Sequence, residues 1–237
     1  MNILALETSA VACSAALCRE EELLAQSFQN SGLTHSRTLM PMVDDLLKNC
    51  AKTLEDVDVI AVAAGPGSFT GLRIGMATAK GLAWPGDKPC AGVSTLEAMA
   101  WGAAHWAGFE ICCVMDARRQ QVYNARFLAL GEGLERLCPD RAVGLEELAG
   151  ELKTSPRPQI LVGDGAVLCY TTLKDLGLDV RLAPPHLRFQ SAWGVARAAL
   201  ELARGGQLTT PAGLTIAYHR LSQAERERLA KEQSKGE

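Results

Sequence analysis

The sequence predicts an α/β fold made of two similar halves, each a mixed sheet with helices packed against it. Three observations support this prediction. Three short apolar runs precede the first helical pattern, and strand and helix then alternate. A second round of strands begins near Glu110. The segments LETSAVACSAAL and VMDARRQQVYNARF also share one form, in which an acidic residue and small polar residues separate two apolar strands.

The first half contains four predicted strands and two predicted helices. The strands are Asn2–Leu6, Cys13–Cys18, Leu23–Phe28 and Val57–Ala63. The segment THSRTLMPMVDDLLKNC places apolar residues at the i, i+4, i+7 and i+8 spacing of an amphipathic helix, and Pro41 favours a start shortly before it. The second helix follows the strand at Val57–Ala63 and begins within a glycine-rich stretch.

The second half repeats this order less clearly. The segments EICCVM, QVYNARFLAL and VRLA are predicted strands, and ILVGDGAV is a predicted strand that enters a glycine turn. SAWGVARAALELARGG is a predicted helix that ends at glycines. A boundary is expected around Ala103–Gly108, which divides the chain into subdomains of residues 1–105 and 106–237. The charged segment AERERLAKEQSKGE is expected to form a terminal helix.

Composition limits the classes of function. Apolar residues make up 48% of the 237 residues, and the net charge is −3 with no basic block, so strong binding of nucleic acid by this chain alone is not expected. No segment approaches the roughly 20 apolar residues that a membrane helix needs, and the N-terminus does not resemble a signal peptide. The eight cysteines form no CxxC pair, which favours packed, reduced thiols in a cytoplasmic protein.

The glycine-rich stretch AGPGSFTGLRIGMATAKGLA, residues 64–83, does not match the usual phosphate-binding motifs. No Gly-Lys-Ser or Gly-Lys-Thr occurs in the chain, so a Walker A loop is excluded. Gly65 and Gly67 begin a GxGxxG pattern, but Thr70 stands where the third glycine is required. The glycines of this stretch therefore need another explanation.

A strip of small residues runs along the helix in this stretch. Gly71, Gly75, Ala79 and Ala83 recur every four residues and share one face. Each interior glycine costs about 1 kcal/mol of helix stability relative to alanine, so two on one face indicate close packing. Spacing alone leaves two alternatives open, because the strip can pack within this chain or against another one.

Four segments together resemble the TsaB (YeaZ) family: LALETS, HSRTLMPMVDDLL, GPGSFTGLRIG and DARRQQVY. The resemblance spans nearly the whole chain. It implies a role in making N6-threonylcarbamoyladenosine at position 37 of tRNA. It also implies an ASKHA fold, the architecture of actin, Hsp70 and sugar kinases, with two RNase-H-like subdomains.

The family resemblance also implies partners. A TsaB-family protein forms a heterodimer with the catalytic paralogue TsaD, a TsaE-like ATPase joins them, and tRNA binds only through the complex. The contact uses the two helices flanking the GPGS strand, and these helices are expected to pair two copies of the chain when it is alone. The expected interface residues are His35, Leu39, Met40, Met42, Val43, Leu46, Gly71, Leu72, Gly75, Met76 and Ala79. A Gly75→Leu variant is then expected to lose the partner and stay folded.

The same resemblance predicts a non-catalytic subunit without a metal site. The catalytic paralogue carries a metal-binding HxxxH after the strand that follows the glycine-rich helix, whereas the aligned positions here are Thr95 and Met99. The four histidines of this chain are far apart in sequence, and no serine or cysteine stands in a recognisable hydrolase motif.

Nucleotide binding is a further expectation from the fold. ASKHA proteins hold phosphates between turns of both halves, and the matching turns here contain Glu7, Thr8, Ser9, Asp116, Arg118, Gly163, Asp164 and Gly165. The carboxylates of Glu7 and Asp116 would repel phosphate, so weak or no ATP binding and no required cofactor are expected for the isolated chain. ATP or ADP at the partner interface is an open alternative. The competing hypothesis for the whole chain is a stand-alone ATP-dependent enzyme.

Overall fold

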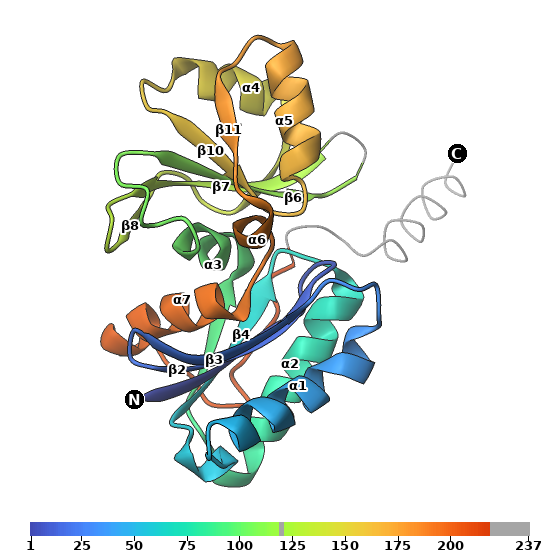
Figure 1. Ribbon diagram of the computed structural model, residues 1–237, viewed down its shortest axis with the longest axis vertical. Coiled ribbons are helices and arrows are strands. Elements are labelled where there is room, and N and C mark those ends of the chain that lie inside the picture. Colours follow the sequence, from blue (N-terminus) through green and yellow to red (C-terminus); the bar gives the residue numbers. More distant parts are fainter. Residues whose placement is uncertain (119–120, 219–237) are drawn as a thin grey trace, which may run out of the picture.

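The structure, a computed structural model, describes residues 1–118 and 121–218 as two lobes, each centred on a mixed β-sheet (Figure 1). The predicted terminal helix and His219 lie outside the described residues. None of the helices found in the described ranges has the length and apolar character needed to cross a membrane.

The first sheet has the strand order β3-β2-β1-β4-β5. Its strands are β1 Asn2–Glu7, β2 Cys13–Arg19, β3 Glu22–Gln29, β4 Val59–Gly65 and β5 Cys90–Ser94. The first three strands are antiparallel neighbours, while β4 and β5 run parallel to β1. The C-terminal ends of β1 and β4 therefore lie at the same edge of the sheet.

The second sheet repeats this order. Its strands are β6 Glu110–Asp116, β7 Gln121–Ala129, β8 Leu134–Arg136, β9 Arg141–Gly144, β10 Gln159–Val162 and β11 Val180–Leu182. The order is β11-β10-β6-β7-β8, and β9 also pairs with β7. In both sheets the first strand is central, with an antiparallel meander on one side and parallel strands on the other. The two expected RNase-H-like halves of an ASKHA fold are thereby confirmed.

Helices cover both faces of the first sheet (Figure 1). Helices α1 His35–Asn49 and α2 Phe69–Ala83 lie on one face, where their apolar sides share a core with β1 and β4. Helix α7 Ala192–Arg204 covers the other face. The remaining elements are α3 Thr95–Trp101, α4 Leu145–Thr154, α5 Ala166–Asp175, α6 Pro185–Arg188 and the 3-10 turns η1 Leu54–Asp56 and η2 Trp84–Gly86.

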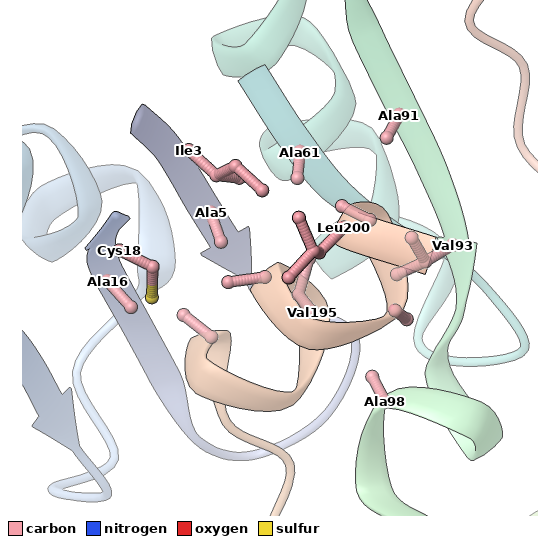
Figure 2. Close-up of a cluster of buried hydrophobic side chains, with 14 of the residues drawn as sticks. Ile3, Ala5, Ala16, Cys18, Ala61, Ala91, Val93, Ala98, Val195 and Leu200 are labelled. Atoms are coloured by element: carbon pink, nitrogen blue, oxygen red, sulfur yellow. The ribbon is translucent and has the colours of Figure 1, made fainter. Parts of the chain in front are cut away.

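Small side chains allow α7 to pack closely on the first sheet. Figure 2 shows Val195 and Leu200 of α7 among Ile3, Ala5 and Ala61 of the central strands. Helix α3 lies between the lobes, because its residues divide between two cores. Ala98 and Trp101 belong to the core around α7, whereas Leu96 and Met99 belong to the core of the second lobe.

The position of α7 changes the expected division of the chain. The predicted second subdomain, residues 106–237, includes α7, yet this helix packs on the first sheet. The segment after α7 also returns to the first lobe, where Thr209 bridges to Cys90 and the Ala217 amide donates to the Ala64 carbonyl at 2.8 Å. The periodicity of α7 predicted a helix correctly but carried no information about which sheet it covers.

Candidate functional sites

Two regions of the structure contain the predicted functional residues: the helix pair α1–α2 and the junction between the lobes. Helix α2 begins after the turn that follows β4. The side chain of Ser68 caps it by accepting a hydrogen bond from the Gly71 amide at 3.3 Å. Since α1 and α2 cover the same sheet face, each has one side against the sheet and one side toward solvent.

The strip of small residues on α2 faces its own chain. A Cβ at Gly71 would overlap the carbonyl oxygen of Thr8, in the turn between β1 and β2. A Cβ at Gly75 would overlap Thr8 Oγ1 and lie 3.3 Å from Val62 Cγ2. Thr8 Oγ1 also donates to the Gly71 carbonyl at 2.8 Å, and Ala79 and Ala83 are fully buried. The strip therefore lets the β1–β2 turn and the sheet approach the helix.

This arrangement corrects the argument that the strip is bare because a partner covers it. Gly71 and Gly75 are occupied by Thr8, so a leucine at Gly75 would disrupt the first lobe and would not leave the chain folded. Most other predicted interface residues also point inward and hold the two helices on the sheet. The buried ones are Leu39, Met42, Val43, Leu46, Leu72 and Met76. His35 is half-buried, with Nε2 2.8 Å from the Ala10 carbonyl oxygen, and Met40 is exposed.

A different face of α2 is open to solvent. Ile74, Ala77 and Gly81 of α2 and the next residue after the helix, Trp84, follow the i, i+3, i+7 and i+10 spacing of one helix face, and we call these four residues the outer face. Ile74 is half-buried and packs against the core beneath the helix. Ala77 and Gly81 are exposed, and Trp84 is 67% exposed. Within residues 1–118 and 121–218, and apart from the neighbouring residues of its own helix, no atom lies within 4 Å of the position that a Cβ at Gly81 would occupy. Sequence reasoning missed this face, although Ala77 and Gly81 are small residues one turn apart.

The start of the outer face is bordered by the last described residue. The Arg73 guanidinium lies 3.7 Å from the centre of the Phe69 ring, and Arg73 Nε donates to the Tyr218 hydroxyl at 3.2 Å. The Tyr218 ring is 5.2 Å from the Phe69 ring, centre to centre. The outer face therefore extends from Ile74 toward the C-terminal end of α2.

The structure brings most of the predicted nucleotide-binding turns together at the interlobe junction. Glu7 ends β1 and Ser9 lies in the turn after it, while the turn after β10 provides Gly163, Asp164 and Gly165. The latter turn is held by hydrogen bonds from the Gly163 amide to the Arg188 carbonyl at 2.6 Å and from the Gly165 amide to the Val114 carbonyl at 3.2 Å. Asp164 Oδ1 accepts from Gln190 Nε2 at 2.8 Å. Gln190 is buried here, and no sequence motif pointed to it.

Asp116 and Arg118 occupy the end of β6 and the turn after it. Both side chains are exposed, and Asp116 Oδ1 accepts a hydrogen bond from the backbone amide of Arg118 at 2.7 Å. This is the local bond of a turn aspartate.

Two acidic groups of the junction are buried. Burial raises the pKa of the Glu7 carboxyl to about 7, and hydrogen bonding with the side chain and the backbone of Ser9, whose amide donates to Glu7 Oε1 at 2.5 Å, opposes this shift. Burial also raises the pKa of Asp164, although its bond to Gln190 opposes this shift. Neighbouring carboxylates raise both pKa values further. The charge of Asp164 raises the pKa of Glu7, and the charge of Asp116 raises the pKa of Asp164. A phosphate group entering this junction would meet acidic side chains.

The positions aligned with the histidine pair of the catalytic paralogue lie in the packed helix α3. Thr95 is fully buried, and Met99 is 4% exposed within the core of the second lobe. Ser94 caps α3 by accepting from the Glu97 amide at 3.1 Å and donates to Asp140 Oδ2 at 2.5 Å. Within residues 1–118 and 121–218, no three His, Cys, Asp or Glu side chains are grouped so that they could hold a metal ion.

Comparisons with known proteins agree with this architecture. Residues 22–176 match the family model described as "TsaD: tRNA N6-adenosine threonylcarbamoyltransferase". A Bacillus subtilis protein named "tRNA threonylcarbamoyladenosine biosynthesis protein TsaB" is 38% identical over 176 residues, 74% of this chain and 76% of the relative. The Escherichia coli protein of the same name is 41% identical over 163 residues, 65% of this chain and 70% of the relative.

A solved structure gives the same result. The chain described as "YeaZ from Pseudomonas aeruginosa" is 27% identical, with a TM-score of 0.78 over 92% of this chain and 99% of that chain. The resemblance found in the sequence motifs is thus confirmed by similarity over most of the chain and by the fold. This chain belongs to the TsaB family of tRNA threonylcarbamoyladenosine biosynthesis proteins.

Proposed function

We propose that this chain is a non-catalytic subunit in the formation of tRNA N6-threonylcarbamoyladenosine, where it binds and activates a TsaD-like catalytic subunit. Membership of the TsaB family supports the pathway, because relatives at 38–41% identity are named for it. The match to the TsaD model supports a paralogous relation between the two subunits. A TsaE-like ATPase and tRNA join through the complex.

The packing of α3 is the observation that carries the non-catalytic assignment. The catalytic paralogue needs two histidines on one helix face to hold a metal. Here the aligned residues are Thr95 and Met99, and both are buried in the packing of a helix between the two lobes. The Met99 thioether and the Thr95 hydroxyl are buried in the packing of this helix. We therefore assign the metal-dependent chemistry to the partner.

The outer face is the surface that we assign to the TsaD-like partner. Ala77 and Gly81 offer little side-chain bulk, so the backbone of a partner helix can approach α2 closely there. Trp84, at the end of this strip, is 67% exposed, and Met40 on α1 is 45% exposed, so both helices also offer adaptable apolar surface. Without the partner, the same face pairs two copies of the chain.

Reconstitution tests this function. Transfer of the threonylcarbamoyl group to tRNA is measured with the TsaD-like subunit, the TsaE-like ATPase and threonylcarbamoyl-AMP, with and without this chain. Modified tRNA is expected only when this chain and the TsaD-like subunit are both present. Equal modification without this chain, or modification by this chain alone, would contradict the proposal.

The second candidate is a stand-alone ATP-dependent enzyme, and the convergence of turns from both lobes at the junction favours it. The acidic residues Glu7, Asp116 and Asp164 oppose it, because they stand in the turns that hold phosphate in ASKHA proteins and any carboxylate charge there repels phosphate. We expect the isolated chain to need no cofactor and to bind ATP weakly or not at all, with any ATP or ADP held at the partner interface. Calorimetric titration of the isolated chain distinguishes the two, since sub-micromolar affinity with rapid ATP turnover would favour the second.

A further inference from the structure

Arg73 is an exposed residue of α2 whose guanidinium is held by two aromatic side chains. The guanidinium lies over the Phe69 ring, and its Nε donates a hydrogen bond to the hydroxyl of Tyr218. The two rings also contact each other, with centres 5.2 Å apart. Because the face of an aromatic ring attracts a cation, these contacts limit the orientations that the arginine can adopt.

The backbone beside Tyr218 fixes this aromatic support in place. The Ala217 amide donates to the carbonyl of Ala64 in β4, and a Cβ at Gly65 would overlap the Ala217 carbonyl oxygen. The segment that carries Tyr218 is therefore packed against β4. Arg73 is thus oriented before a partner arrives, which reduces the conformational entropy that the side chain loses on binding.

The terminal nitrogens of Arg73 have no acceptor within the described part of the chain. The bond to Tyr218 uses Nε, whereas Nη1 and Nη2 make no hydrogen bond and no ion pair within residues 1–118 and 121–218. The two terminal nitrogens of a guanidinium fit the two oxygens of a carboxylate or the oxygens of a phosphate. The side chain is therefore prepared for an anionic group from outside the described chain.

The position of Arg73 and the charge of the chain favour a carboxylate of a protein. Arg73 lies one helical turn before Ala77, so it borders the outer face that we assign to the TsaD-like subunit. The chain has a net charge of −3 and no basic block, whereas a surface that binds the phosphates of tRNA gathers several cations.

We propose that Arg73 binds a carboxylate of the TsaD-like subunit. This inference rests on the proposed function, because it requires that subunit to dock on the outer face. Phe69 and Tyr218 are positioning residues, since they orient the guanidinium that makes the contact.

Titration calorimetry of the intact chain with the TsaD-like subunit tests the proposal. Arg73→Gln should weaken binding at least about tenfold. Arg73→Glu should weaken it more, because two carboxylates would then repel each other, and Arg73→Lys should weaken it less than Arg73→Gln, because the charge is kept. Tyr218→Phe removes only the hydroxyl that accepts from Arg73 and should have the smallest effect of the four.

Arg181→Gln is the matched control. Arg181 of β11 is also exposed and lies over an aromatic ring, 5.0 Å from the centre of Phe109, but it belongs to the second lobe. Its replacement should leave the affinity unchanged. Added salt should weaken binding of the wild type and have a smaller effect on Arg73→Gln, because salt screens the charge pair.

The outcomes separate this inference from the proposed function. A wild-type chain that does not bind the TsaD-like subunit would contradict the proposed function itself. Binding by the wild type and equal binding by Arg73→Gln would overturn the role of Arg73 alone. An effect of Arg73→Gln that is confined to self-association, or to tRNA binding by the assembled complex, would overturn it as well.

Discussion

Two strips of small residues on helix α2 have opposite surroundings. Gly71 and Gly75 are filled by Thr8 of the same chain, whereas Ala77 and Gly81 face open space. Both strips have the spacing that permits close approach of another backbone. The comparison shows that a strip of small residues indicates close packing of another backbone against the helix. It does not indicate whether that backbone belongs to the same chain.

The two strips also differ in what their glycines contribute to stability. At Gly71 the missing side chain is required, because a Cβ would overlap the Thr8 carbonyl oxygen. At Gly81 no contact within the described chain requires a glycine, yet the residue costs about 1 kcal/mol of helix stability relative to alanine. No contact within the described chain offsets this loss of helix stability, which is consistent with another protein packing against Gly81.

The largest expected effect is on the buried strip. Gly71→Leu should lower the free energy of unfolding by at least about 3 kcal/mol, because a side chain is forced against the Thr8 backbone. Urea denaturation followed by circular dichroism measures the loss. Gly150→Leu is the control, since a Cβ at this exposed glycine of α4 meets no atom of another described segment within 4 Å and should cause no loss. Equal stabilities of the two variants would show that the strip is not packed.

The next effect concerns Glu7, which precedes the threonine that fills the buried strip. Because the folded state raises the pKa of Glu7 from 4.5 to about 7, it binds this proton more tightly than the unfolded state. Stability should therefore fall as the pH rises from about 4.5 to about 7 and then level off. Glu7→Gln removes this loss and should be more stable than wild type at pH 8 by up to about 3 kcal/mol.

Thermal and urea unfolding at pH 4.5 and pH 8 measure this prediction. Glu55→Gln provides the control for loss of an exposed carboxyl. A Glu7→Gln variant with the same pH dependence as wild type would mean that Glu7 is ionised in the folded protein at neutral pH.

The smallest effect is expected on the exposed strip. Gly81→Ala should raise the free energy of unfolding by up to about 1 kcal/mol, because alanine favours the helix and its methyl group enters open space. Gly75→Ala should have the opposite sign, since its methyl group would meet Thr8 Oγ1. Urea denaturation of both variants gives the comparison, and destabilisation by Gly81→Ala would show that this side is not open.

Periodicity predicted much of the fold. The apolar spacing between Leu39 and Cys50 predicted α1, which spans His35–Asn49, and the run Val57–Ala63 predicted β4, which spans Val59–Gly65. The short strands β8 and β9 and the helices α4 and α5 were not predicted. Strands of three or four residues carry little periodic signal, and the fold places them through pairing with β7.

The sites were less predictable, because their contacts join residues distant in sequence. Thr8 meets Gly71 and Gly75 more than 60 residues later, and Gln190 meets Asp164 across 26 residues. The spacing of the glycines predicted one smooth helix face correctly but not the turn that fills it. The spacing of the small residues Ala77 and Gly81 indicates the outer face. That pattern could be recognised only after the structure showed that the face of Gly71 and Gly75 is buried.

The affinity of this chain for the TsaD-like subunit tests the central claim most directly. Titration calorimetry compares Gly81→Glu on α2 with Gly150→Glu on α4, two exposed helix glycines with open space around them. A glutamate on the outer face should weaken binding at least about tenfold, equivalent to about 1.4 kcal/mol, while the glutamate on α4 should leave it unchanged. Unchanged affinity of Gly81→Glu would contradict the assignment of the outer face to the partner.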